Sequence, residues 1–215
     1  MTHQACGKQM IPSPLTTVSR RVALGLAAAL PLLRAGRAMA DAGSDKASGF
    51  IDRLSHDLMA VVNGPQSTAD KAAALQKIID TNVDVDGVAK FCLGRFWRTA
   101  TPDEQKQYLT LFHKVLVNNI TGKVGEYAGV QITVQRSAQR EDGIAVTTSV
   151  TRPNSEPNKV DWLVSIDGAT PLVTDVIAEG TSLRLTQRND YSAFLTRNNN
   201  SVSALIDALK QQAGN

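Results

Sequence analysis

The feature that most constrains this fold is a change of hydrophobic period near residue 130. Upstream, apolar residues recur at steps of three and four, which is the spacing of one face of a helix. Downstream, apolar and polar residues alternate, which is the spacing of a half-buried strand. Three alternating runs and a fourth strand-like segment lie at residues 130–135, 144–150, 160–166 and 172–178. Short turn-forming segments separate these runs, so we predict a four-stranded antiparallel meander.

Helical patterns lie on both sides of the predicted strands. They cover about residues 50–61, 72–79, 84–93, 101–120, 182–196 and 201–211. The clearest start signal is Thr101 as N-cap, with Pro102 at the first helical position and Glu104 three residues after the cap. Runs of helices that flank a run of strands indicate an α+β fold. We therefore expect a curved sheet packed by N-terminal and C-terminal helices.

The first forty residues are predicted to be a cleaved signal peptide. An arginine pair at residues 20 and 21 precedes an apolar run over 22–33, and Ala38-Met39-Ala40 supplies the small residues of a cleavage site before Asp41. The alternative is a membrane span, but about a dozen residues interrupted by a proline fall short of the ~20 that a spanning helix needs. The arginine pair also resembles a twin-arginine export signal, so that pathway and general secretion both stay open. We expect residues 41–215 to form a single domain outside the cytoplasm.

Removal of the leader changes the charge of the chain. The full sequence has 23 basic and 20 acidic residues and a net charge of +3. Five of the basic residues and none of the acidic ones lie in the first forty positions, which leaves 18 against 20 and a net charge of −2. The basic excess belongs to the leader, so we expect no nucleic-acid partner. Cys92 is then the single remaining cysteine, which excludes an intramolecular disulfide.

The search for catalytic and metal-binding patterns is mostly negative. His56 and His113 lie on different predicted helices, and neither stands at metal-ligand spacing from Cys92 or from paired acids. We therefore expect no metal site and no cofactor. Because Cys92 lies on an apolar helix face, we interpret it as a small buried hydrophobic residue rather than a nucleophile. The sequence has no nucleophile elbow and no phosphate-binding glycine run.

Three carboxylates near the ends of neighbouring strands keep an enzyme open as an alternative. They are Asp161, Asp175 and Glu179. A curved sheet closed by helices can hold an acid-base residue in an apolar cavity. The alternation argues against this interpretation, because Asp161 faces away from Trp162 and Asp175 faces away from Val176.

Several separated segments resemble one family. Residues 93–102, with the sequence LGRFWRTATP, together with Tyr108 and Phe112, resemble the signature segment of the MlaC or toluene-tolerance family of periplasmic lipid carriers. Residues 160–162 and 175–183 resemble its later strand motifs in the same order, and the tail from Tyr191 resembles its closing helices. The chain departs from the family at residues 170–172, Thr181 and 198–200, which affects the cavity and its cargo more than the fold. A hopanoid-associated subgroup, HpnM, shares the pattern.

The resemblance implies a shuttle that holds the acyl chains of a phospholipid or hopanoid-type lipid in an apolar cavity between sheet and helices. It implies exchange of this lipid with the membrane-bound substrate-binding component of an ABC transporter and with an outer-membrane lipoprotein complex. Such binding needs apolar surface rather than a catalytic group, since each buried CH2 contributes ~0.8 kcal/mol. Arg95 and Arg98 are predicted to contact a partner or the lipid headgroup. The predicted lipid-binding residues, each with an ordinary place in the core as its alternative, are Trp97, Tyr108, Phe112, Val115, Val146, Val150, Trp162, Val164 and Val176.

Overall fold

A computed structural model describes the backbone of residues 32–214 and the side chains of residues 42–214. The chain divides into two compact units, Met1–Ala38 and Met39–Asn215, and the description below concerns the second. The predicted signal peptide and its cleavage site lie outside the residues whose side chains are described, so both stay predictions. Within residues 32–214, no helix is long and apolar enough to cross a membrane.

Helices occupy the chain up to the sheet. A complete capping box confirms the predicted helix start: Glu104 N donates to Thr101 Oγ1 at 3.2 Å, and Thr101 N donates to Glu104 Oε2 at 2.9 Å. This exchange satisfies two backbone donors that otherwise lack partners at a helix N-terminus. The elements are α1 (Leu32–Asn63), α2 (Thr68–Asn82), α3 (Val85–Leu93), the 3-10 helix η1 (Gly94–Arg98), α4 (Pro102–Thr121) and the 3-10 helix η2 (Val124–Tyr127).

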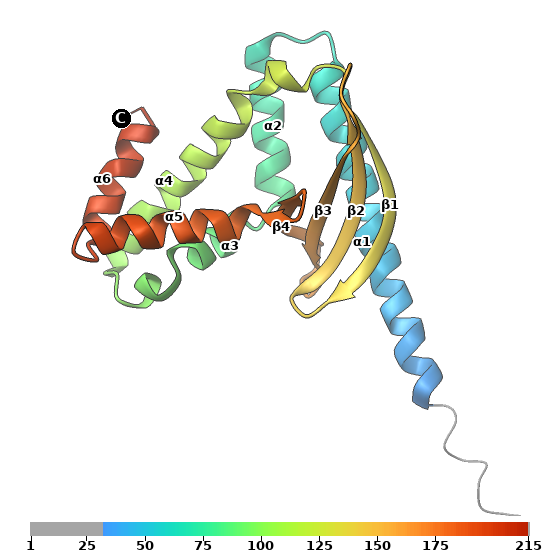
Figure 1. The fold of residues 1–215 in the computed structure, drawn as a ribbon, viewed down its shortest axis with the longest axis horizontal. Coiled ribbons are helices and arrows are strands. Elements are labelled where there is room, and N and C mark those ends of the chain that lie inside the picture. Colours follow the sequence, from blue (N-terminus) through green and yellow to red (C-terminus); the bar gives the residue numbers. More distant parts are fainter. Residues whose placement is uncertain (1–31, 215) are drawn as a thin grey trace, which may run out of the picture. The chain divides into compact units, whose positions relative to one another are not determined.

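The sheet is an antiparallel meander of five strands in the order β1-β2-β3-β4-β5. The prediction of four strands is wrong by one, because Thr181 and Ser182 turn back and pair with Ala178 and Ile177. A two-residue strand is too short for alternation to reveal it. Figure 1 shows β1 to β3 as long bent strands with α1 behind them. The bounds are β1 (Gln131–Arg140), β2 (Gly143–Thr151), β3 (Asn158–Ser165), β4 (Leu172–Ala178) and β5 (Thr181–Ser182).

Two further helices complete the fold, as the sequence predicts. They are α5 (Leu183–Arg197), which packs on α3 and β4, and α6 (Val202–Gln212), which packs on α4. A serine caps each of them: Ser182 Oγ accepts from Leu185 N, and Ser201 Oγ accepts from Ala204 N, both at 3.1 Å. The α+β class is thereby confirmed.

Three hydrophobic clusters stabilise these elements. The helical core joins α3, η1, α4, α5 and α6, with Ile79 of α2. The sheet core packs α1 between Ala47 and Leu54 against β2, β3 and β4. A smaller third cluster links the end of α1 to α2, η2 and the start of β1. Val83, between α2 and α3, contacts both the helical core and the sheet core, and it forms a parallel bridge with Val173 of β4.

Candidate functional site

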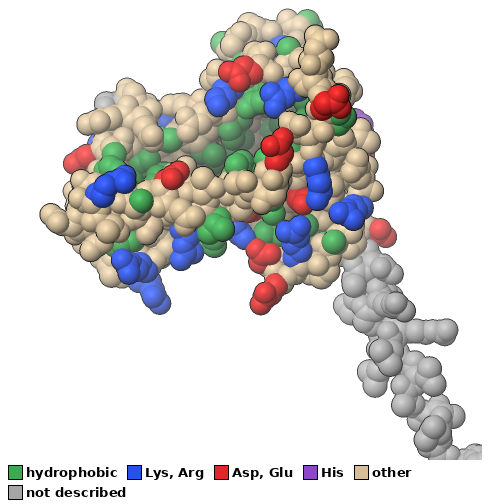
Figure 2. All heavy atoms as spheres, in the orientation of Figure 1, with side chains coloured by type: hydrophobic (Ala, Val, Ile, Leu, Met, Phe, Trp, Pro, Cys, Tyr) green, Lys and Arg blue, Asp and Glu red, His purple; other side chains and the backbone are tan. Residues whose placement is uncertain are grey.

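A hollow lies between the helical part and the sheet part of residues 39–214. Figure 2 shows hydrophobic side chains gathered on its floor, in the region that α2, α4, α5 and the sheet surround in Figure 1. Contiguous exposed apolar surface is uncommon on soluble proteins and usually marks a binding site. The predicted lipid-binding residues can therefore be sorted by whether their side chains are buried or have accessible apolar surface.

On α4, the predicted residues are closed within the helical core. Tyr108 is fully buried, and its hydroxyl donates to Ala89 O at 2.8 Å. Its ring lies 5.9 Å from the Phe112 ring and 6.2 Å from the Tyr191 ring, so the three rings form one aromatic cluster. Val115 is buried in the same core. All three side chains pack within the helical core, and their assignment as lipid-binding residues stays a prediction.

On the sheet, the predicted residues range from fully buried to half-buried. Val146, Trp162 and Val176 are register partners on β2, β3 and β4 and share the face against which α1 packs. Val146 is fully buried, as is Val164, whereas Trp162, Val176 and Val150 are half-buried. The closed residues lie under α1. The half-buried ones offer apolar surface beyond it.

A buried threonine fixes the orientation of Trp162. The indole Nε1 donates to Thr148 Oγ1 at 3.0 Å, and that hydroxyl donates to Val160 O at 3.1 Å. Thr148 is fully buried, so both of its polar contacts are made away from water. The half-buried ring therefore presents a fixed apolar surface. Alternation predicted the face of Trp162, but its polar partner is set by strand register, which the sequence pattern alone does not reveal.

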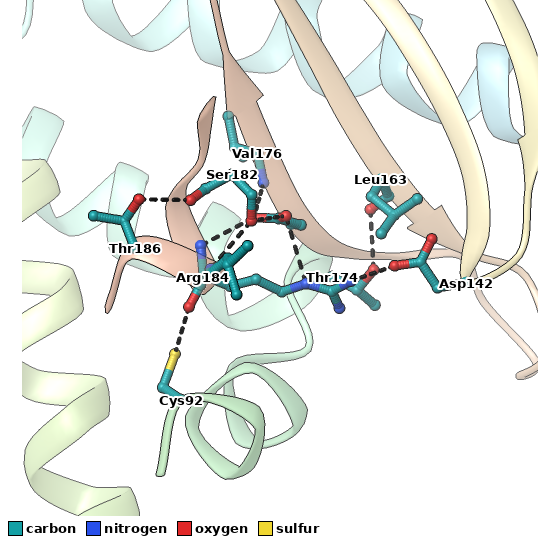
Figure 3. A network of polar contacts seen from close by, with 10 residues as sticks. Cys92, Asp142, Leu163, Thr174, Val176, Ser182, Arg184 and Thr186 are labelled. Atoms are coloured by element: carbon teal, nitrogen blue, oxygen red, sulfur yellow. Dashed lines mark hydrogen bonds and ion pairs between the residues drawn. The ribbon is translucent and has the colours of Figure 1, made fainter. Parts of the chain in front are cut away.

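The carboxylate of Asp175 links β4 to the start of α5. Figure 3 labels its partners Val176, Ser182 and Arg184. The carboxylate accepts from Val176 N at 2.8 Å, Arg184 N at 3.1 Å and Ser182 Oγ at 2.6 Å, and it lies 3.4 Å from Arg184 Nε. The same guanidinium also contacts Asp142 in the turn between β1 and β2. Each oxygen of Asp175 therefore already has partners within the protein. This pattern is that of a structural carboxylate rather than a free acid or base.

Asp161 occupies a separate polar network on β3. Thr147 Oγ1 donates to it at 2.6 Å, and Lys159 Nζ and Arg140 Nη2 lie at 3.3 and 3.4 Å. Burial alone would raise the pKa of this carboxyl, but the Thr147 hydroxyl and the two cations outweigh burial and lower the pKa. Asp161 and Asp175 share no partner. The sequence predicted that both face away from the apolar side of the sheet, but it did not predict their burial.

The remaining candidates for chemistry also lie apart. Glu179 is exposed in the turn between β4 and β5, where its φ is +51°. Burial, reinforced by the charge of Asp175, raises the pKa of the Cys92 thiol to about 12, and Sγ donates to Arg184 O at 3.5 Å. A thiol of this kind stays protonated at neutral pH, which agrees with its interpretation as a buried hydrophobic residue. His113 pairs with Asp80 at 2.6 Å on the helix surface.

The signature segment forms η1 and the start of α4. Trp97 packs against the helical core but is only half-buried, and Lys90 Nζ lies 5.5 Å from the centre of its ring. Arg95 and Arg98 are both exposed, so each is accessible to a partner or a headgroup. Because side chains three residues apart eclipse in a 3-10 helix, the two arginines lie on the same side of η1.

Comparison with known proteins identifies the family of this chain. The model of the family described as MlaC protein matches residues 52–211, which is well over half of the chain. This chain belongs to the MlaC family. Among MlaC-type relatives, the toluene tolerance protein ttg2D of Pseudomonas putida is 29% identical over 199 residues, which cover 90% of each chain.

A solved structure shares the fold of this family member. It is the phospholipid-binding protein of Ralstonia solanacearum, solved in complex with a phospholipid. The two chains are 21% identical, and the match has a TM-score of 0.68 over 79% of this chain and 97% of the other. The match of residues 52–211 to the family model confirms the family that the sequence resembles, and the solved structure shows the same fold. The α+β arrangement extends beyond this single chain.

Proposed function

We propose that this MlaC-family protein is a periplasmic lipid carrier. The observation that carries the proposal is the hollow with a hydrophobic floor between helices and sheet, seen in Figure 2. The relative of known structure binds a phospholipid with the same fold, which supports a lipid as cargo here. Apolar burial supplies the binding free energy, at ~0.8 kcal/mol for each CH2 removed from water. The carriage of lipid requires no catalytic group.

The half-buried apolar residues of the sheet are the proposed wall. Trp162, Val176 and Val150 have accessible surface on the face against which α1 packs, and we place them at the edge of the hollow. Val146 and Val164, at 0% exposure, are proposed as the layer that supports this wall from behind. On α4, the half-buried Leu116 and Ile120 extend the apolar surface past the closed aromatic cluster. A lipid in the hollow would thus contact the half-buried predicted residues rather than the fully buried ones.

Lipid extraction from the purified protein tests the proposal. Wild-type protein is expected to release lipid to organic solvent, and mass spectrometry distinguishes a phospholipid from a hopanoid. Val176→Trp is expected to narrow the hollow and reduce the extracted lipid while the fold persists. The matched control is Val164→Trp, where overpacking of a closed core costs about 1–3 kcal/mol and lowers stability instead. A lipid-free wild-type protein would end the carrier proposal, and full retention of lipid by Val176→Trp would exclude this wall.

Exchange with an ABC transport system and export to the periplasm complete the proposal. The leader-like first forty residues and the family membership support export, and the identity of the partners follows the family resemblance. N-terminal sequencing of protein from the periplasm is expected to begin at Asp41. Combined Arg20→Lys and Arg21→Lys substitution is expected to block export if the twin-arginine receptor reads the pair. Normal periplasmic levels of that variant would assign export to general secretion.

A further inference from the structure

Four cations from two distant segments gather around Phe91 and η1. Lys90, Arg95 and Arg98 come from the end of α3 and from η1, and Arg188 comes from α5. The Arg188 guanidinium lies 4.9 Å from the centre of the Phe91 ring and 3.3 Å from where a side chain at Gly94 would begin. Packing of α3 against α5 therefore joins two groups of charges that lie some ninety positions apart in the sequence. We call these four residues the basic surface.

Cations of the basic surface contact aromatic rings rather than carboxylates. Among the described residues, none of its four cations makes an ion pair, although the neighbouring Arg184 contacts both Asp175 and Asp142. Aromatic rings hold three of the four instead: Lys90 lies over Trp97, Arg95 over Phe96 at 4.8 Å, and Arg188 over Phe91. Stacking fixes the position of a cation but leaves its charge uncompensated. Like charges held close together repel one another until an anion binds.

An exposed leucine at the start of α5 adjoins this surface. Leu183 and Leu185, in the first turn of α5, are 52% and 49% exposed and are the large hydrophobic residues most open to solvent among those described. They flank Arg184, whose guanidinium lies 4.5 Å from the Phe91 ring. Leu185 also precedes Arg188 by three residues, so the two side chains are neighbours on the helix surface. Leu185 therefore borders the basic surface, whereas Leu183, two positions before it, lies on another side of α5.

We propose that the basic surface and Leu185 dock this protein on an anionic lipid surface. Unpaired cations attract anionic headgroups, and an adjacent leucine inserts at the boundary between headgroups and acyl chains. Cations beside an exposed apolar side chain match this boundary, and an acidic protein partner is the alternative outcome of the test below. The proposal concerns where the protein docks rather than what the hollow carries, so it does not depend on the proposed cargo.

Vesicle flotation of the purified protein tests the proposal. Protein is mixed with vesicles of equal parts phosphatidylglycerol and phosphatidylcholine, or of phosphatidylcholine alone, at low salt and at 0.5 M salt. We expect flotation with the anionic vesicles only, and weaker flotation at high salt. Combined Arg95→Gln and Arg98→Gln substitution should reduce the partition coefficient about 25-fold, since each cation near such a surface contributes about fivefold. Leu185→Ser substitution should weaken flotation even at low salt.

A matched control separates local charge from net charge. Combined Lys123→Gln and Arg152→Gln substitution removes two exposed cations near η2 and the turn between β2 and β3, and it should leave flotation unchanged. Equal losses of flotation in the arginine variant and in the control variant would overturn the proposal. Absence of flotation by wild-type protein would also overturn it, and the basic surface would then be assigned to an acidic protein partner. Lipid extracted from unfloated protein reports carriage separately, and circular dichroism verifies that each variant is folded.

Discussion

Arg184 contacts two carboxylates, one buried and one exposed. It therefore allows a direct test of how burial sets the contribution of a carboxylate to the free energy of unfolding. The side chain of Asp175 is 3% exposed and that of Asp142 is 53% exposed, while Arg184 itself is 17% exposed. Asp175→Ala removes the acceptor of two backbone donors and the Ser182 hydroxyl as well as the buried half of an ion pair. Asp142→Ala removes only an exposed ion pair from the same guanidinium.

The two substitutions should differ several-fold in cost. Loss of one partner of a buried ion pair costs about 3–5 kcal/mol, and we expect about 3 kcal/mol for Asp175→Ala because Arg184 keeps Asp142. An exposed pair is worth about 0–1 kcal/mol, which is the expected cost of Asp142→Ala. In a domain of about 175 residues, each kcal/mol lowers Tm by about 2–4 °C. The melting temperature should therefore fall by about 6–12 °C for Asp175→Ala and by about 4 °C or less for Asp142→Ala.

Urea unfolding followed by circular dichroism, together with thermal melts, measures both costs. Equal destabilisation by the two substitutions would refute the argument from burial. Asp175→Asn provides a second arm, because it keeps the shape of the side chain and removes its charge. If that variant abolished a turnover that the wild-type protein performs on a lipid, without loss of stability, the carboxylate would be catalytic and the alternative of an enzyme would return.

Three further predictions concern single side chains. The pKa of Asp161 is lowered in the folded state, so its charge contributes fully to stability above the ordinary pKa near 3.9, and this contribution is lost as the pH falls through the folded value. Asp161→Asn should cost about 1–3 kcal/mol of unfolding free energy at pH 7. In unfolding titrations this cost should shrink below pH 4. Cys92 should react with a thiol reagent at pH 8 only after denaturation, and fast labelling of the native protein would contradict its burial. Thr101→Ala should cost about 1 kcal/mol by loss of the capping box, whereas an unchanged urea midpoint would show that the cap contributes nothing.

Local signals in the sequence predicted the elements of this fold well. The capping box at Thr101 and Glu104 depends on residues three apart, and strand alternation depends on residues two apart, so both are visible without tertiary knowledge. β5 was missed because its two residues become a strand only through pairing with β4. Such pairing is a property of the folded chain.

The candidate site was harder to predict for a related reason. Alternation assigns Val146 and Trp162 to one face, but α1 covers the first and leaves the second half-open. The same limit applies to Asp175, whose burial depends on Arg184 of α5. Whether an apolar side chain becomes core or wall depends on which distant element lies over it. The pattern of one strand carries no information about that neighbour.

The separation of the cores has a mechanical consequence. Val83 packs against both the helical core and the sheet core, and α3 and α5 also contact β4, where Arg184 pairs with Asp175. Rotation about this joint would change the gap between the two cores while the contacts inside each stay intact. The free energy of widening would then be set by the contacts at the joint rather than by the packing of either core. If the hollow carries lipid as proposed, we expect such a joint to admit cargo of differing width without partial unfolding.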